Sequence, residues 1–382
     1  MLKKKSNFWK LAILAIGLIA LIFAGFFVYK FNIKKEIVLK KEQKTGNINL
    51  LILGIGGGTH DGPNLTDTII VAMVNPTKNT VNLVSVPRDL WIPDINGKIN
   101  KTYQLGLDKN DTSKLLVKSV VKKVTGKQID YVVVIDFSGF VKLVDYLGGI
   151  DVDVAHTLDD YNYPIEGKET DLCGHPEEEV KDFVATGPAE LEQWEYFTCR
   201  YKHLHVDQGM QHMDGETALQ FSRSRHGING EGSDFARSRR QQEVISAIKS
   251  KVLSLGIILN PVKVIGILNI LKDNIDTDIT PNEYDDFINL AQKMQKAKIS
   301  SYVIDFGDQS EDRFGLLKED IPSQSKGFQY NLIPRVGDGD FSEINSYVNC
   351  VAGNHMCDIT EKGLLIDPTP TPSVTIKPSV KR

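Results

Sequence analysis

The chain has 382 residues, of which 41% are hydrophobic and 25% are charged, values typical of a globular protein with one large domain or two ordinary ones. Its formal net charge is -4, which excludes the global positive field that nucleic-acid-binding proteins use. Any binding of an anionic ligand must therefore come from local clusters of arginine.

The N-terminal residues predict a membrane anchor. Residues 1–10 carry four lysines, and the apolar run that follows predicts a transmembrane helix over residues 11–29. About 20 helical residues cross a bilayer core of about 30 Å. A cleavable signal peptide is the alternative, but no small-residue cleavage site follows the run. We expect a single-pass protein of the cell membrane, with residues 1–10 as a short cytoplasmic tail and residues 30–46 as an extracytoplasmic stalk.

Lysines flank the apolar run on both sides, so charge alone does not set its orientation. We place the folded part outside the cytoplasm because the preceding tail would be very short and because the cysteine pattern suits an oxidising compartment.

From residue 47 onward, short apolar runs alternate with segments of helical periodicity. The predicted strands are 49–53, 68–75, 80–86, 131–137, 150–154 and 301–306. The predicted helices are 113–124, 138–147, 234–255, 261–271 and 283–295. This alternation predicts an α/β fold, a three-layer α-β-α sandwich. The turn at 76–79 makes two neighbouring strands a hairpin, so the central sheet should be mixed.

The main folded domain is predicted to span residues 47–310. Residues 156–208 are rich in acidic residues, Tyr and His, and read as an insertion in that domain. Residues 311–364 would be a C-terminal extension. Residues 365–382, rich in Pro and Thr, are expected to be a disordered tail.

The four cysteines form two sequence-local pairs, Cys173 with Cys199 and Cys350 with Cys357. Neither pair has the CxxC spacing of common zinc sites, although histidines near the first pair keep zinc as an alternative. Two disulfides are expected if the domain lies outside the cytoplasm, and four unpaired thiols otherwise.

Two arginines in the segment Phe221-Ser-Arg-Ser-Arg-His are candidates for binding an anion. If residues 218–225 are extended, Arg223 and Arg225 project from the same face of a strand. Two guanidinium groups on one face suit a pyrophosphate, which offers several anionic oxygens. The alternative is a solvated strand edge.

The helix that follows carries three further candidates, Asp234, Arg237 and Gln241, spaced to share one face. Ser233 is a predicted N-cap, which places Asp234 in the first turn. The alternative is an ordinary charged helix face, and that interpretation also covers Arg239 and Arg240.

A second cluster involves Asp67 and Arg88. The predicted hairpin brings the start of one strand near the end of the other, so these two side chains should be neighbours. Asp67 is a candidate ligand for Mg²⁺, which would bridge phosphate oxygens. The alternative is a simple ion pair.

Gly54-Ile-Gly-Gly-Gly fits neither the Walker A pattern nor GxGxxG, so a turn is expected there. Asp136, Asp151 and Asp153 read as loop or strand-edge residues.

Eight of these segments, taken in order, resemble the LytR-CpsA-Psr family of cell-wall phosphotransferases. The matching segments are Leu65-Thr-Asp-Thr-Ile, Ser85-Val-Pro-Arg-Asp, Lys98-Ile-Asn, Asp136-Phe-Ser-Gly-Phe, Val144-Asp-Tyr-Leu-Gly-Gly-Ile, Met213-Asp-Gly-Glu-Thr-Ala-Leu, Ser222-Arg-Ser-Arg and Asp234-Phe-Ala-Arg-Ser-Arg-Arg-Gln. Each is weak alone, but their ordered set after an N-terminal membrane span is specific.

The resemblance implies a reaction. Family members transfer a glycopolymer, such as a teichoic acid or a capsule, from a polyprenyl-pyrophosphate carrier to a hydroxyl of peptidoglycan during cell-wall assembly. The link is a phosphodiester, and Mg²⁺ (or Mn²⁺) is the cofactor. The implied partners are the lipid-linked glycan donor, the peptidoglycan acceptor and the membrane.

The resemblance also implies roles for single residues. Asp67 resembles the metal-binding and catalytic aspartate. The residues that resemble the pyrophosphate-binding arginines and the acidic and amide groups beside them are Arg88, Arg223, Arg225, Arg237, Asp234 and Gln241. Many members have an aspartate after the first strand, where this chain has glycines; Asp61 is the alternative metal ligand here. A lipid-pyrophosphate hydrolase and a non-catalytic cell-wall binding or regulatory module are the competing functions.

Overall fold

The computed structural model describes residues 47–58, 62–186, 193–254, 257, 261–308, 313–320, 323–326 and 330–370. The predicted cytoplasmic tail, transmembrane helix (11–29) and stalk lie outside these residues. Within the ranges described, no helix is both long enough and apolar enough to cross a membrane.

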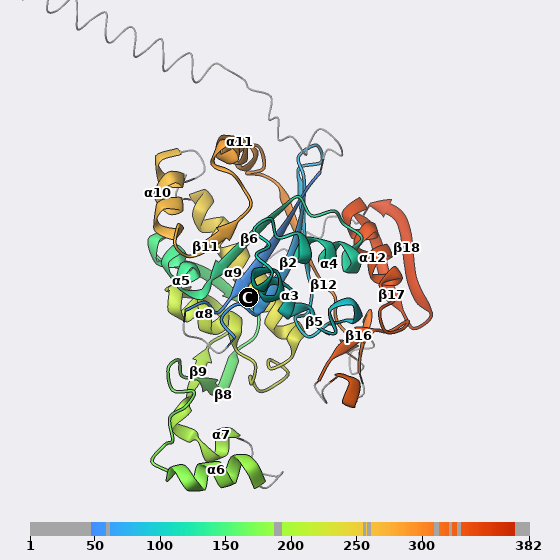
Figure 1. Ribbon diagram of the computed structural model, residues 1–382. Coiled ribbons are helices and arrows are strands. Elements are labelled where there is room, and N and C mark those ends of the chain that lie inside the picture. Colours follow the sequence, from blue (N-terminus) through green and yellow to red (C-terminus); the bar gives the residue numbers. More distant parts are fainter. Residues whose placement is uncertain are drawn as a thin grey trace, which may run out of the picture.

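A six-stranded mixed sheet forms the centre of the molecule (Figure 1). In spatial order its strands are β11 (Ile275–Thr277), β6 (Tyr131–Asp136), β1 (Ile48–Ile55), β2 (Thr66–Asn75), β3 (Thr80–Ser85) and β12 (Lys298–Val303). β1 is parallel to β6 and antiparallel to β2, and β2 pairs with β3 as the predicted hairpin. The prediction of an α/β fold with a mixed central sheet is confirmed.

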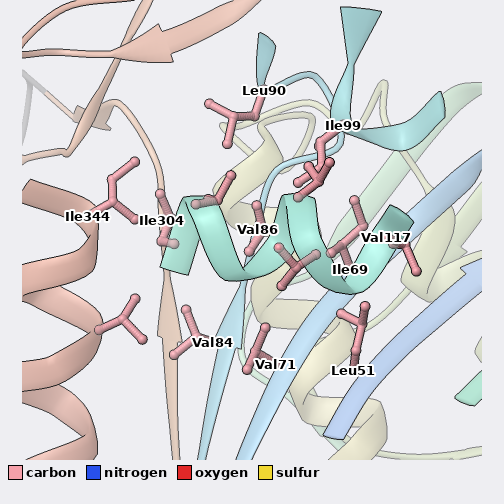
Figure 2. Close-up of a cluster of buried hydrophobic side chains, with 14 of the residues drawn as sticks. Leu51, Ile69, Val71, Val84, Val86, Leu90, Ile99, Val117, Ile304 and Ile344 are labelled. Carbon is pink, nitrogen blue, oxygen red and sulfur yellow. The ribbon is translucent and has the colours of Figure 1, made fainter. Parts of the chain in front are cut away.

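Helices pack against both faces of the sheet. On one face, α4 (Leu115–Thr125) and α12 (Ser342–Gly353) cover the largest hydrophobic cluster, to which Val117, Ile344 and Val71 all belong (Figure 2). On the other face, Ile245 of α9 (Asp234–Ser254) packs against Ile70. Alternate residues of β1 point into these different clusters, as the two-residue period of a strand requires.

The remaining helices of the body are α3 (Thr102–Asp108), α5 (Phe137–Tyr146), α8 (Gly215–Arg223), α10 (Pro261–Leu271) and α11 (Tyr284–Lys293). α5, α8 and α9 share a second hydrophobic cluster with the ribbon of β7 (Ile150–Val154) and β10 (Gly209–Met213). The short ribbons elsewhere pair β4 (Trp91–Ile92) with β5 (Gly97–Lys98), β13 (Gly307–Asp308) with β14 (Arg313–Phe314), and β15 (Leu317–Glu319) with β16 (Leu332–Pro334).

Two local predictions are wrong. Residues 218–225 are not extended: α8 begins after Asp214, whose carboxylate accepts a hydrogen bond from the Thr217 amide, and runs to Arg223. The helix predicted to begin at residue 138 begins at Phe137 and is capped by Asp136, whose carboxylate accepts from the Gly139 amide at 2.7 Å.

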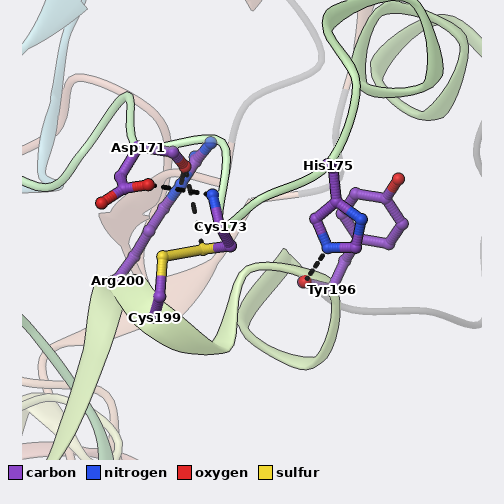
Figure 3. The surroundings of a disulfide bond; sticks show 6 residues. All are labelled: Asp171, Cys173, His175, Tyr196, Cys199 and Arg200. Atoms are coloured by element: carbon purple, nitrogen blue, oxygen red, sulfur yellow. Dashed lines mark hydrogen bonds between the residues drawn. A yellow bond between two sulfur atoms is a disulfide. The ribbon is translucent and has the colours of Figure 1, made fainter.

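The segment between β7 and β10 projects from the body (Figure 1). It contains β8 (Leu158–Pro164), α6 (Glu177–Thr186), α7 (Gln193–Tyr196) and β9 (Tyr201–Val206), with β8 and β9 paired antiparallel. Cys173 and Cys199 are joined by a disulfide at 2.03 Å (Figure 3). Beside it, Arg200 Nε donates to the Asp171 carbonyl at 2.6 Å.

The C-terminal part belongs to the main body. Ile344 and Val348 of α12 are fully buried in the largest cluster, and Cys350 of α12 is disulfide-bonded to Cys357 of β17 (His355–Thr360). β18 (Gly363–Pro370) pairs with β17. The predicted disorder is therefore wrong for residues 365–370, because backbone pairing and the side chain of Leu364 hold this strand against the core.

Candidate functional site

A cavity of about 270 Å³ brings together six of the residues singled out from the sequence. Strands β1, β2 and β6 and helices α5, α8 and α9 contribute most of its walls. Its charged and amide-bearing lining residues are Asp67, Arg88, Asp136, Arg223, Arg225, His226, Arg237 and Gln241. Its larger apolar residues are Ile52, Ile70, Ile135, Phe137, Phe140, Leu219, Val244 and Ile245. The cavity thus combines a dense group of cations with an extensive apolar wall.

Asp67 and Arg88 form an ion pair between Oδ1 and Nη1, as the hairpin geometry predicted. Their side chains are 32% and 23% exposed, so both remain accessible from the cavity. Asp67 lies at the beginning of β2, and Arg88 follows β3.

Asp89 is a buried carboxylate that holds Arg88 in position. Lys98 Nζ donates to Asp89 Oδ1 at 2.7 Å, and Arg88 Nε lies 3.6 Å from Asp89 Oδ2. Burial acts to raise the pKa of Asp89, but the hydrogen bond from Lys98 and the charges of Arg88, Lys98 and Arg225 outweigh it and lower that pKa. A buried carboxylate that stays ionised counterbalances part of the positive charge of the cavity.

Arg223 enters the cavity from the last turn of α8. Its Cζ lies 3.9 Å above the ring centroid of Phe137, the first residue of α5. Such a cation–π contact orients a guanidinium group. Ser224 then leaves the helical conformation, with φ -48° and ψ 137°, and this turn of the chain brings Arg225 to the same cavity.

Arg240 holds the loop between α8 and α9 in place. Its side chain is 1% exposed, and its guanidinium donates to the carbonyls of Phe221, Ser224 and Glu231 at 2.6–2.8 Å. It also pairs with Glu231 Oε2 at 2.9 Å. The sequence interpretation of Arg240 as part of an exposed charged face is wrong.

β8 supports the same loop from the other side. Asp160 is fully buried, and its Oδ2 accepts from Ser224 Oγ at 2.6 Å and from the His226 amide at 3.3 Å. The two residues that receive this support are the neighbours of Arg225 on either side in the chain.

α9 brings two of its three candidates to the cavity. Ser233 caps the helix, since its Oγ accepts from the Ala236 amide at 3.1 Å, as predicted. Arg237 is 8% exposed and lines the cavity, and Gln241 Nε2 donates to Thr68 Oγ1 at 3.1 Å. Asp234 is the first residue of α9, and its side chain lies outside the described part of the structure, as does Asp61.

Asp136 is a cavity residue that the sequence interpretation missed. Besides capping α5, its two carboxylate oxygens each accept from Asn274 Nδ2 at 3.0 Å. Its place between a buried strand and the Phe-Ser-Gly start of a helix was the available signal. Mg²⁺ is commonly held by one or two carboxylates together with substrate phosphates, so Asp67 and Asp136 fit that ion.

The glycine run after β1 forms a turn, as expected. The Gly57 amide donates to the Pro63 carbonyl at 2.8 Å, and Gly57 has φ +70°. A Cβ at this position would lie 2.7 Å from Asp136 Cβ, so a glycine permits the close approach.

Known proteins are similar in sequence to much of this chain. The polyisoprenyl-teichoic acid–peptidoglycan teichoic acid transferase TagV of Bacillus subtilis (strain 168) is 26% identical over 261 residues, which cover 66% of this chain and 54% of TagV. The similarly named TagU of Enterococcus faecalis (strain ATCC 700802 / V583) is 28% identical over 278 residues, 69% of this chain and 72% of TagU. The chain therefore spans about half the length of the first relative and more of the second.

Solved structures share the fold. A protein from Streptococcus agalactiae superimposes with a TM-score of 0.53 at 21% identity, covering 82% of this chain and 91% of that one. The crystal structure of Bacillus subtilis TagV gives a TM-score of 0.52 at 21% identity, covering 80% and 97%. The sequence model of the LytR_cpsA_psr family matches residues 29–323, from before β1 to beyond β15. The chain belongs to the LytR_cpsA_psr family.

Proposed function

We propose that this protein transfers a glycopolymer from a polyprenyl-pyrophosphate carrier to a hydroxyl of peptidoglycan and forms a phosphodiester link. The observation that carries the proposal is the cavity in which four arginines and two carboxylates share one space with apolar side chains. The names of the relatives, which describe transfer of polyisoprenyl-linked teichoic acid to peptidoglycan, support it.

The polar lining suits a pyrophosphate. Arg88, Arg223, Arg225 and Arg237 all line the cavity, and guanidinium groups bind phosphate oxygens in pairs of parallel hydrogen bonds. The apolar lining, including Phe140 of α5, suits the hydrocarbon chain of a lipid carrier. A water-soluble nucleotide would leave that apolar wall without a partner.

The reaction requires charge stabilisation more than a protein nucleophile. The acceptor hydroxyl oxygen attacks the phosphorus that carries the glycan, and the bond between that phosphorus and the bridging oxygen breaks. Polyprenyl phosphate leaves, and the arginines stabilise the charge that develops on its oxygens. The carboxylate of Asp67 or of Asp234 receives the hydroxyl proton.

Bound Mg²⁺ (or Mn²⁺) would neutralise the pyrophosphate oxygens, with Asp67 as its first protein ligand and Asp136 as the second. Asp136 would then take the part that an aspartate after the first strand plays in other family members. The Asp67–Arg88 ion pair would rearrange when the donor binds, because both groups then have phosphate oxygens or the metal as partners.

We further propose that residues 11–29 anchor the protein in the cell membrane and that residues 47–310 act outside the cytoplasm. A lipid-linked donor is confined to the membrane, so a tether keeps the cavity close to it. The two disulfides are consistent with an oxidising compartment.

The test supplies the full-length protein in liposomes with a polyprenyl-pyrophosphate-linked teichoic acid and peptidoglycan. We expect glycan covalently attached to peptidoglycan, and a loss of more than about a hundredfold in Asp67→Asn or Arg223→Ala, equivalent to about 3 kcal/mol in the transition state. The exposed Lys123→Ala variant is the control. Free phosphorylated glycan without a covalent product would identify a hydrolase, and the absence of both products would favour a non-catalytic module. Unchanged activity in both variants would contradict the assignment of the cavity as the active site.

A further inference from the structure

Three side chains of types that bind metals converge on the exposed face of the β8–β9 ribbon. None of the three is among the residues that line the cavity. Asp159 of β8 lies directly opposite His205 of β9, and His203 lies two residues earlier on the same face. Asp159 Oδ1 is 2.6 Å from His203 Nε2 and 3.0 Å from His205 Nδ1. The alternate residues of β9, Leu204 and Val206, are buried.

We propose that Asp159, His203 and His205 bind a zinc-class divalent cation. Two imidazole nitrogens and a carboxylate oxygen are typical zinc ligands, with bonds of about 2.0–2.2 Å in a tetrahedral arrangement. Neighbouring ligand atoms in such a tetrahedron are about 3.3 Å apart by the same geometry. The observed separations of 2.6 and 3.0 Å therefore need only small side-chain rotations to admit the ion. A fourth position would remain open to water.

The surroundings of both histidines favour this role. His205 Nε2 lies 3.1 Å from Asp207 Oδ1, so a histidine bound to metal through Nδ1 would donate its remaining N–H to a carboxylate. That arrangement is the usual outer contact of a zinc-bound histidine. The His203 ring stacks on Tyr161 with centroids 4.1 Å apart and planes inclined by 2°, which fixes the direction of Nε2.

A proton is the competing occupant of His205. Hydrogen bonds to Asp159 and Asp207 raise the pKa of His205, so the imidazole also suits the charged form. Metal binding requires neutral imidazoles, and its affinity should therefore fall as the pH is lowered.

The ion would stabilise β8, the strand that supports the loop carrying Arg225 between α8 and α9. The Asp159 carbonyl accepts from the Ile228 amide at 2.9 Å, and the next residue, Asp160, holds Ser224. A cation bridging β8 to β9 would therefore restrain a segment that contacts the loop from Ser224 to Ile228. This inference does not depend on the proposed transferase reaction.

The test titrates ZnCl₂ into the metal-free, full-length protein by calorimetry, with excess Mg²⁺ present to occupy any magnesium site. We expect a single Zn²⁺ per chain, and the visible absorption of tetrahedral Co²⁺ when Co²⁺ replaces it. Asp207→Asn should weaken binding about tenfold, because it removes only the outer contact. His203→Ala and His205→Ala should abolish this binding.

His212→Ala is the matched control. His212 Nδ1 lies 2.7 Å from Asp151 Oδ1 in an exposed His–Asp pair between β10 and β7. This pair has the same chemistry, but among the residues that the structure describes it belongs to no group of three such ligands. Loss of the His212 imidazole should leave the affinity for Zn²⁺ unchanged. Thermal melting without zinc shows that each variant is folded. Absence of micromolar binding, binding that survives in the His203→Ala/His205→Ala double variant, or an equal loss in His212→Ala would overturn the proposal.

Discussion

Arg240 stabilises the site without lining the cavity. Its guanidinium satisfies three backbone carbonyls and the carboxylate of Glu231, and all of these are buried. Arg240→Met should destabilise the fold by about 3–5 kcal/mol, because it leaves a buried carboxylate without this partner. Urea unfolding measures the change. The exposed Lys123→Met variant, which breaks the Lys123–Asp94 pair, should cost at most about 1 kcal/mol, and a similar cost for both variants would contradict the role of Arg240.

Glu243 gives the stability of the protein a specific pH dependence. Burial raises the pKa of Glu243 to about 7 from an ordinary value of 4.5, although Arg239 acts to lower it. Between these values the folded state keeps a proton that the unfolded state has released, so stability falls as the pH rises.

The Glu243→Gln variant should remove this dependence. At pH 8 it should be more stable than the native protein by about 2 kcal/mol, and near pH 4 the two should be equal. Comparing urea midpoints of both proteins at each pH cancels the contribution of other groups. A difference that does not change with pH would exclude Glu243 as the cause.

Removal of divalent metal should abolish the proposed transfer. EDTA-treated protein should regain activity with Mg²⁺, and Asp67→Asn should require a higher Mg²⁺ concentration for any residual activity, because one carboxylate ligand is lost. The measurement is product formation across a Mg²⁺ titration. Full activity in EDTA would contradict the assignment of Asp67 as a metal ligand.

At the level of elements, β8 positions the loop that carries Arg225. Asp160→Asn keeps the size of the side chain but replaces one acceptor oxygen by a donor, so its hydrogen bonds from Ser224 and His226 are weakened. Misplacement of a binding group by about 1 Å can cost about a hundredfold in rate. We expect that order of loss in transfer with little change in secondary structure by circular dichroism. Asp153→Asn, on the exposed face of β7, should leave the rate unchanged.

Much of the central sheet follows from local sequence. β1, β2, β3 and β6 were predicted because each is an apolar run bounded by turn residues, and the hairpin followed from the turn at 76–79. The position of β11 next to β6 had no local signal: a three-residue strand gains its place only from pairing with a distant segment. α8 was missed because Ser222-Arg-Ser-Arg looks alternating, whereas the cap at Asp214 and the burial of Leu219 and Phe221 decide the helix.

The residues of the site that belong to a sequence motif could be predicted. Residues whose role depends on burial in the folded structure could not. Asp67, Arg88, Arg223, Arg225, Arg237 and Gln241 all line one cavity. The role of Arg240 was hidden, because its partners are carbonyl groups of a loop that sequence does not place. Asp136 was hidden too, because its access to the cavity depends on how β6 meets α5.

For the whole molecule, the proposed compartment has a direct chemical check. Protein isolated from membranes and alkylated without reductant should contain no labelled cysteine, because both cysteine pairs are bonded in the structure. Mass spectrometry before and after reduction gives the count. Four labelled cysteines without reductant would contradict an oxidising location.

The pairing of Pro164 with Tyr201 has an evolutionary consequence. Chain that lies beyond this pair can lengthen, shrink or be exchanged for another module without shifting the register of Asp159 or Asp160. The register shift between Asp160 and Tyr163 shows that the ribbon accommodates an extra residue there. A single residue gained or lost between Leu158 and Asp160 would instead exchange the faces of β8, turning the buried carboxylate outward and the histidine partner inward. Related proteins should therefore vary freely in length between residues 165 and 200, and this tip is the place to graft a new specificity.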